Sequence, residues 1–424
     1  MARNKISVTK QQGGLGRKVQ NADNVIGLIA GGVAVSGKLV LGTRYVCNSI
    51  KDVKALGIDA AYDSANTVLL YRRLERIYTR NKSAEVHLMV VAQATLLAEM
   101  VNIANGTPYG KNLLRSAGGR IKYLGIVRNP SSYDPDLSDG LDVDVLDAVG
   151  YAQELYNSEA AEFRYAQIVI EGRYFNGTVG SAIDLRTLEA PNVSVAILAD
   201  PSISKSNEMF NNYAAVEDVL GCLSVAAVSQ NIGENNKTLF NLQNVARGYY
   251  NDSSDINGCI GLSSNSVLSS YNEADLQVLN DKGYIFGEPV TGLAGLYLND
   301  SHTCDVITSD YAYIENNATI DKATALARTA LLPKVNARLK ADTESGQLAA
   351  VEEQGLISIA IDSLEGMEKD GDISGGRDAE INPDNPDYDL LAGDDLVVAV
   401  SFIPMAIGRT ISLQIGFNNP KKAN

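Results

Sequence analysis

The sequence predicts a mixed α/β protein whose last residues form strands. Three observations carry this prediction. Short apolar runs alternate with amphipathic segments over 24–230, the pattern of a mixed sheet layered with helices. A basic amphipathic segment at 321–340 precedes an Asp-rich stretch, and two β-like runs at 395–403 and 409–417 follow it. Apolar residues alternate with polar ones near both ends of the chain, as in half-buried strands.

The elements of the first part follow from the spacing of apolar residues. Ser49, with Asp52 three residues later, fits the start of a short helix. We expect strands at 24–31, 38–47, 85–92 and 121–127, and helices at 49–56, 65–80 and 93–104. A loop rich in Pro and Asp follows the last of these strands.

The middle of the chain continues the same alternation and then becomes irregular. We expect helices at 142–156, 213–229 and 275–282, strands at 165–175, 193–199 and 283–298, and a loop rich in Asn, Ser and Gly at 231–272. This order favours one continuous α/β layer.

The C-terminal part has a different character. One apolar stripe runs along 319–340, and Pro333 predicts a kink or a break in that helix because proline cannot donate the backbone bond. A second helical region is expected at 345–370, and an acidic loop at 370–395.

Terminal strands at both ends are the most informative feature. Near the C-terminus the apolar residues alternate with Ser412, Gln414 and Gly416. The residues expected to exchange between chains are Ile6, Val8, Ile411, Leu413, Ile415 and Phe417. Such strands can add to a sheet of a neighbouring copy by main-chain hydrogen bonding.

Composition excludes several classes of protein. The length of 424 residues suggests two or three domains. A net charge of −15 argues against general nucleic-acid binding, which needs a basic face. We find neither an apolar run of membrane-spanning length nor a secretory signal, so Cys47, Cys222, Cys259 and Cys304 are expected to be reduced, buried thiols.

No catalytic residue, metal ligand or cofactor is assigned. The chain has only two histidines, which leaves little for acid–base or metal chemistry. Gly32–Lys38 matches the spacing of a phosphate-binding loop, but Leu39 stands where Ser or Thr is required and a strand-like run follows. A strand, a turn and a second strand fit better. Asp370–Gly375 resembles the start of a calcium-binding loop, but Ile381 replaces the final Glu, and an acidic surface loop is the better interpretation.

The basic segment has two interpretations. Its cations are Lys322, Arg328, Lys334, Arg338 and Lys340. Long charged side chains often only solvate a helix. In an acidic chain with strand-like ends, they can also form a docking face for an acidic partner.

Several segments, taken in order, resemble contractile-tail sheath proteins. They are VIGLIAGGVAVSGKLVLGTRYVCNSIKDVKALGI (25–58), VLLYRRLERIYTRNKSAEVHLMVV (68–91), LNDKGYIFGEPVTGLAGLYLND (279–300) and ITSDYAYIENNATIDKATALARTALLPKVNARL (307–339). The final strands resemble that family too, whereas 130–275 resembles it weakly. Asn316 and Asn317 stand where typical sheaths have an Arg, which indicates a divergent branch.

The resemblance implies an inner α/β domain with exchanged terminal strands and an inserted outer α/β domain. It divides the chain into an N-terminal arm (1–22), an outer domain (23–305, with a subdomain break near 130–160), an inner domain (306–408) and a C-terminal arm (409–424).

It also implies a function and partners. Copies would form a helical polymer of six-fold rings around an inner tube, which the five cations would contact, together with baseplate and tail-terminator components. The polymer would assemble in the bacterial cytoplasm and belong to a phage tail or an injection particle. It would contract to drive the tube through a membrane, without inserting into that membrane itself.

Two other classes of protein remain open from the sequence. One is a nucleotide enzyme with a phosphate-binding loop built on the 24–230 layer. The other is a capsid or surface-lattice protein, which also exchanges its ends but forms shells or flat lattices.

Overall fold

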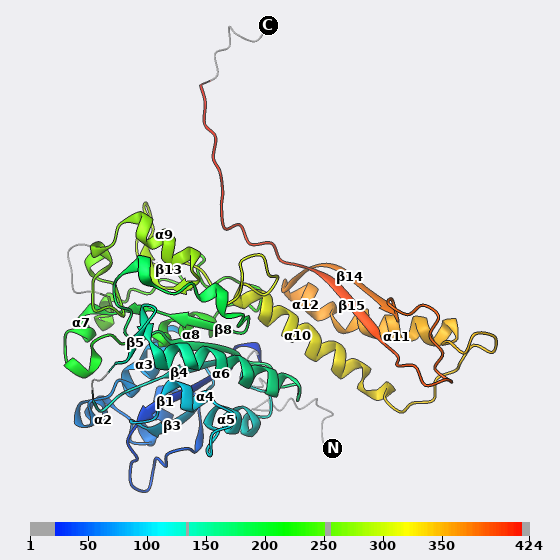
Figure 1. Cartoon of the computed structure of the whole chain (residues 1–424), viewed down its shortest axis with the longest axis horizontal. Helices are drawn as coiled ribbons and strands as arrows, with labels where there is room; N and C mark the ends of the chain where they lie inside the picture. The colour runs from blue at the N-terminus through cyan, green and yellow to red at the C-terminus, as the bar shows by residue number, and fades with distance from the viewer. Residues whose placement is uncertain (1–21, 133–134, 251–255, 418–424) are drawn as a thin grey trace, which may run out of the picture. The chain divides into compact units, whose positions relative to one another are not determined.

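The computed structural model describes residues 22–132, 135–250 and 256–417. The chain divides into two compact units, Met1–Ala325 and Leu326–Asn424, called unit 1 and unit 2 below. Figure 1 labels helices and strands of both units.

A seven-stranded sheet forms the centre of unit 1. Its strand order is β11-β8-β7-β4-β1-β3-β2. The strands are β1 (Ile26–Gly32), β2 (Arg44–Cys47), β3 (Val86–Ala92), β4 (Tyr123–Val127), β7 (Gln167–Glu171), β8 (Val193–Ala196) and β11 (Tyr284–Ile285). All neighbours are parallel except β2 and β3, which confirms the predicted mixed sheet.

β1 lies between two parallel partners. Ile26 is paired with Val86 of β3 on one side and with Tyr123 of β4 on the other. All seven residues of β1 are buried. A parallel strand covered on both faces needs a continuous apolar run instead of an alternating one, and this is why the run in the sequence was readable as a strand.

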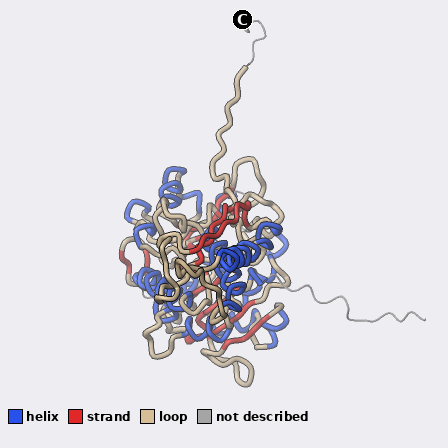
Figure 2. Tube along the Cα trace, turned by 90° about the vertical axis from the view of Figure 1, so that its right-hand side faces the viewer, coloured by secondary structure: helices blue, strands red, loops and turns tan. Residues whose placement is uncertain are grey.

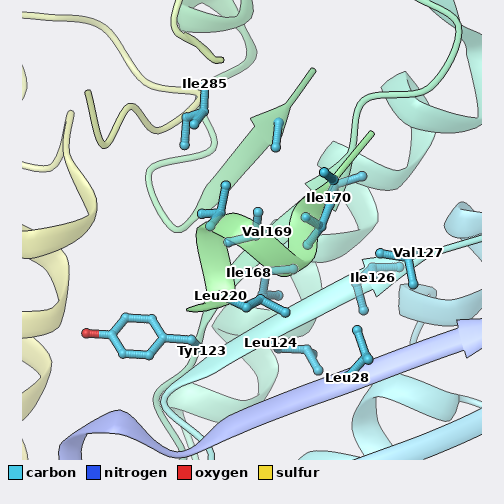
Figure 3. Close-up of a cluster of buried hydrophobic side chains, with 14 of the residues drawn as sticks. Leu28, Tyr123, Leu124, Ile126, Val127, Ile168, Val169, Ile170, Leu220 and Ile285 are labelled. Carbon is cyan, nitrogen blue, oxygen red and sulfur yellow. The ribbon is translucent and has the colours of Figure 1, made fainter. Parts of the chain in front are cut away.

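Helices cover both faces of this sheet. α3 (Leu70–Arg80) and α8 (Val216–Leu223) contact β1, β4 and β7, whereas α4 (Leu97–Val101), α5 (Tyr109–Ala117) and α6 (Val143–Ala160) form a second group against the sheet. Figure 3 shows Leu28, Leu124 and Ile168 from neighbouring strands in one cluster with Leu220 of α8. Gly125 permits this contact, because a Cβ there would lie 2.5 Å from Leu220 Cδ1.

Smaller elements complete unit 1. Three helices of unit 1 that the sequence did not predict are α2 (Ala60–Asn66), α5 and the short α7 (Pro201–Ser204). The others are α1 (Ile50–Ala55), α9 (Glu273–Asp281), β5 (Leu137–Ser138), β6 (Leu141–Asp142), β9 (Leu198–Ala199), β10 (Gly261–Leu262), β12 (Gly287–Pro289) and β13 (Leu296–Leu298). Asp59 caps α2, since its carboxylate accepts a 2.9 Å bond from Tyr62 N.

The boundary between the units falls within α10 (Ile314–Leu331). The helix ends before Pro333, and a 3-10 turn over Leu332–Lys334 follows. The break predicted at this proline is therefore confirmed, and the basic segment is not one continuous helix.

After α10 and the 3-10 turn, the described residues of unit 2 form two helices and one hairpin. They are α11 (Ala350–Ser363), α12 (Glu365–Asp370), β14 (Ile373–Ile381) and β15 (Val398–Pro404), and β14 and β15 pair antiparallel. The predicted helical region at 345–370 and the strand at 395–403 are confirmed. The expectation of a loop throughout 370–395 is wrong, because β14 occupies part of it. Ile373, Gly375 and Ala379 are buried while their neighbours face outward, an alternation hidden by the surrounding Asp and Gly residues.

The predicted strand at 409–417 is not a strand in the single chain. Residues 405–417 have no assigned helix or strand, and Figure 2 colours this segment as loop. A β-strand requires a partner, and among the described residues none pairs with it. The strand expected at Ile6 and Val8 lies outside the described residues.

Candidate assembly surface

The crevice where open α/β sheets bind ligands is occupied by protein side chains. The strand order reverses at β1 and β4, and ligands usually bind at the carboxyl ends of such strands. Here Asn129 follows β4 and lies across that place. Its Nδ2 donates to Gly31 O at 2.7 Å, and its Oδ1 accepts from Leu69 N at 3.1 Å. The side chain thereby ties the two strand ends to the start of α3.

The Gly32–Lys38 segment does not form a phosphate-binding loop. Val35 and Leu39 pair across a tight turn, with N–O distances of 3.0 and 2.9 Å. A phosphate site needs a helix beginning directly after the lysine, and the next element is instead the strand β2. The predicted arrangement of strand, turn and strand is confirmed.

A buried network of charges lies beside the crevice. Arg73 Nη2 is 2.5 Å from Glu171 Oε1, and Arg73 Nη1 is 2.6 Å from Glu217 Oε2, with all three side chains almost fully buried. Burial alone would raise the pKa of Glu171, but the charges of Arg73 and Arg173 hold it below its ordinary value. Burial raises the pKa of Glu217 despite the opposing charge of Arg73.

Two more pairs extend this network. Arg72 reaches Asp200 at 2.7 Å, and Arg76 bonds Asp218. Because the arginines all lie on α3 and their partners lie on β7, α8 and the loop after β9, the network holds these elements in register. These buried ion pairs therefore have a structural role.

The described residues offer little for metal or membrane chemistry. Among them, no cluster of three or more His, Cys, Asp or Glu side chains is placed to hold a metal ion. No described helix is long and apolar enough to span a bilayer. All four cysteines are buried, as predicted.

Four of the five most exposed large apolar side chains among the described residues lie in the C-terminal segment, and the fifth is Val351. The relative exposures are 87% for Ile411, 79% for Leu413, 85% for Ile415 and 109% for Phe417. Their spacing of two places all four on one face of an extended strand. Exposed apolar groups in such a row mark an interaction site.

The hairpin of unit 2 has open edges. β14 and β15 form a two-stranded sheet, so each has one edge without a partner strand among the described residues. A two-stranded hairpin is marginally stable in water. Its edges expose backbone N–H and C=O groups that can pair with a further strand.

The structure separates the five predicted cations. Lys322 lies in unit 1 and forms a 2.6 Å ion pair with Asp23. Arg328 lies on α10, Lys334 in the 3-10 turn, and Arg338 and Lys340 are exposed in the loop that follows. The expectation of one helical face carrying all five is therefore wrong.

The sequence analysis also missed that the buried face of α10 carries polar residues. Asn317, one of the two residues that depart from the sheath pattern, is buried and donates from Nδ2 to Pro191 O and Tyr311 O at 2.8 Å each. One helical turn later, Asp321 accepts bonds from Tyr156 and Gln167. Their spacing of four residues was the available signal.

Comparison with solved structures defines the class of fold. The chain is 13% identical to a protein of the anti-feeding prophage (AFP) baseplate, with 99% of this chain and 100% of that chain covered and a TM-score of 0.57. For the AFP helical sheath in the contracted state, the identity is 14%, the coverage 99% and 100%, and the TM-score 0.57. For the contracted PVC sheath complex of an extracellular contractile injection system, the identity is 10% and the TM-score is 0.53. The match covers 100% of this chain and 99% of that chain. The chain therefore has the fold of contractile sheath proteins.

Sequence-family models make the assignment specific. The DUF2586 N-terminal domain matches residues 3–302, and the DUF2586 C-terminal domain matches residues 310–422. The chain belongs to the DUF2586 family. No curated protein matches it.

Proposed function

We propose that this chain is the structural subunit of a contractile sheath. Copies polymerise as stacked six-fold rings around an inner tube and contract to drive that tube through a membrane. The observation that carries the proposal is the row of apolar side chains from Ile411 to Phe417, exposed beside a two-stranded hairpin with open edges. The full-length similarity to sheath proteins of two injection systems supports it.

Strand exchange links the copies. Ile411–Phe417 of one copy adds to the hairpin of the next, and Ile6 and Val8 act in the same way at the other end. Burying each Ile, Leu or Phe side chain contributes about 1.5–3 kcal/mol, and main-chain bonds add direction. Since these bonds do not set the angle between neighbouring cores, the cores can rotate during contraction while the links persist.

The proposed sheath subunit has two arms and two domains. The arms are 1–22 and 409–424, the outer domain is 23–305, and the inner domain is 306–408. The two family models meet between residues 302 and 310, in support of the boundary at 305. The boundary between the two compact units lies further along the chain, after Ala325.

The end of α10 and the basic loop after it contact the inner tube. Arg328, Lys334, Arg338 and Lys340 carry this contact, and Lys322 contributes less because Asp23 neutralises it. Further partners are the baseplate and tail-terminator components. The protein works without catalysis, assembles in the bacterial cytoplasm, and does not insert into the membrane or bind nucleic acid.

Electron microscopy in negative stain tests this proposal. The purified full-length chain, alone or produced together with its tube protein, should form hollow striated cylinders. A variant lacking 409–424 should stay monomeric and folded. Flat lattices or closed shells would instead support a surface-layer or capsid protein, and cylinders from the truncated chain would refute the strand link.

A further inference from the structure

A cavity of about 710 Å³ lies in unit 1, lined by α9 and by the turn that joins β12 to β13. Leu276 of α9 and Val290 and Leu293 of the turn contribute apolar, half-buried side chains, and Tyr271 lies just before the helix. Small-molecule sites typically have volumes of about 300–1,000 Å³ and apolar walls with a few polar groups. The described lining residues belong neither to the C-terminal segment nor to the basic loop after α10.

Strand alternation directs Glu288 of β12 toward this cavity. Gly287 faces the core, since a Cβ there would lie 2.5 Å from Ile260 Cδ1. Successive residues of a strand point to opposite faces, so the side chain of Glu288 points away from that core and lines the cavity. The backbone of Glu288 pairs with Tyr297 of β13, which holds the residue in place.

The carboxylate of Glu288 has no counterion. Burial raises the pKa of Glu288, the negative charge of Glu273 adds to the rise, and neither a cation nor a hydrogen bond opposes it among the described residues. Both carboxylate oxygens keep accessible surface, so a ligand in the cavity can reach them. No described residue of the lining is a Lys, Arg or His. The cavity thus offers a partly buried negative charge and an apolar wall, and it supplies no positive charge of its own.

We propose that this cavity binds an organic cation, in which an ammonium or guanidinium group is carried on an aliphatic stem. The cationic group forms a charge-assisted hydrogen bond with Glu288. The stem packs against Leu276, Val290 and Leu293, as the stems of Lys and Arg do on apolar surfaces. Glu273, exposed at the start of α9, adds attraction at longer range.

Other ligand classes fit this lining less well. An anion would meet two carboxylates, and a neutral apolar ligand would bury the charge of Glu288 further without compensating it. A free alkyl cation and a Lys or Arg side chain of another protein share the chemistry that the cavity requires.

Titration calorimetry of the full-length chain with n-butylguanidinium, at about pH 8, tests the proposal. We expect one saturable site per chain. n-Butylurea, which has a similar shape without the charge, should bind at least about tenfold more weakly. Glu288→Gln should weaken the binding of n-butylguanidinium by about tenfold or more, the change expected for a lost hydrogen bond between charged groups. The same variant should leave the binding of n-butylurea unchanged.

Glu154→Gln is the matched control, because Glu154 is exposed on α6 and outside the lining. Its affinity for n-butylguanidinium should equal that of the wild type, and melting curves without the probe should show that both variants are folded. The affinity of the wild type should fall as the pH is lowered, since protonation of Glu288 removes the attraction, and Glu288→Gln should show a smaller dependence on pH.

A peptide with one arginine between two glycines distinguishes the two sources of the cation. Tighter binding of this peptide than of n-butylguanidinium would assign the cavity to a protein side chain, and weaker binding would assign it to a free cation. Unsaturable heats with both probes, or equal affinities of the wild type and Glu288→Gln for n-butylguanidinium, would overturn the proposal. The test does not depend on the proposed sheath function.

Discussion

The hydroxyl of Tyr156 donates a 2.6 Å hydrogen bond to the carboxylate of Asp321. Tyr156 lies on α6 and Asp321 on α10, so this bond fastens the first half of α10 to the layer beside the sheet. Gln167 of β7 donates a second bond to the same carboxylate at 2.8 Å. The helix is thus held in unit 1 mainly by polar contacts.

This contact predicts a pH dependence of stability. Burial raises the pKa of Asp321 to about 6, although Tyr156, Gln167 and Lys122 oppose the rise. The folded chain therefore binds this proton more tightly than the unfolded chain, whose ordinary value is 3.8. The contribution of Asp321 to the free energy of unfolding should rise as the pH falls from about 7 to about 4.

Asp321→Asn should remove that part of the rise. Denaturant unfolding at several pH values gives the free energy of unfolding of each protein. The difference between wild type and variant at each pH is the contribution of Asp321. Asp370→Asn, at an exposed position on α12, serves as the control. Parallel pH curves for wild type and Asp321→Asn would show that this carboxyl does not titrate in the window.

Replacing Arg73 with Met should destabilise unit 1 strongly. The change leaves Glu217 buried without its paired cation and Glu171 with only the 3.2 Å pair to Arg173. Breaking a buried ion pair in this way typically costs about 3–5 kcal/mol. Arg120→Met is the matched control, because that arginine is about half exposed and pairs with Glu85; surface pairs contribute about 0–1 kcal/mol. Equal midpoints of urea unfolding for the two variants would contradict the role of the network.

Gly125→Ala should lower stability by overpacking. The added Cβ would lie 2.5 Å from Leu220 Cδ1 and 3.3 Å from Val216 Cγ1, and such crowding costs about 1–3 kcal/mol. Gly150→Ala on α6 meets nothing within 4 Å and should gain about 0.5–1 kcal/mol. Thermal melting distinguishes the two variants: the melting temperature should fall for Gly125→Ala and rise for Gly150→Ala.

Substituting the outward apolar row should abolish assembly without unfolding the chain. Ile411→Ser, Leu413→Ser and Ile415→Ser combined remove side chains that are almost fully exposed in the monomer. The melting temperature should stay constant while sedimenting polymer disappears. Ser412→Ala with Gln414→Ala changes the other face of the same segment and should assemble normally. If both variants assemble equally well, the alternation carries no function.

Reversing the charge of the basic loop should weaken tube binding. Lys334→Glu with Arg338→Glu replaces two cations in the segment after α10, and charge complementarity at such a contact depends on ionic strength. Co-sedimentation with the tube protein over a salt series should show lower binding and a smaller slope than the wild type. Lys51→Glu in unit 1 should leave both quantities unchanged, and undiminished binding of the double variant would exclude the loop.

The sheet was predictable because its strands are buried on both faces. β1, β3 and β4 are short, continuous apolar runs rich in β-branched residues, and their short length distinguishes such runs from buried helices. β14 was missed because Asp and Gly surround its few buried residues. α5 was missed since it is a short helix with few apolar residues, and tertiary contacts stabilise it.

The candidate site was only partly readable, because its contacts cross long stretches of sequence. Lys322 looked like a free cation, yet Asp23 lies 299 residues away and pairs with it. The partners of Arg73 stand 98 and 144 residues further along the chain. The segment after Gly408 was predicted as a strand from its alternation, but no strand among the described residues pairs with it.

Because all four cysteines are buried, the protein should react slowly with thiol reagents. Burial raises the pKa of Cys47 to about 12 and that of Cys222 to about 11, and thiolate is the reactive form. A cysteine introduced at an exposed position would therefore be the single site labelled under mild conditions. Two such cysteines in one copy, labelled as a fluorophore pair, would report the distance between them during the proposed contraction.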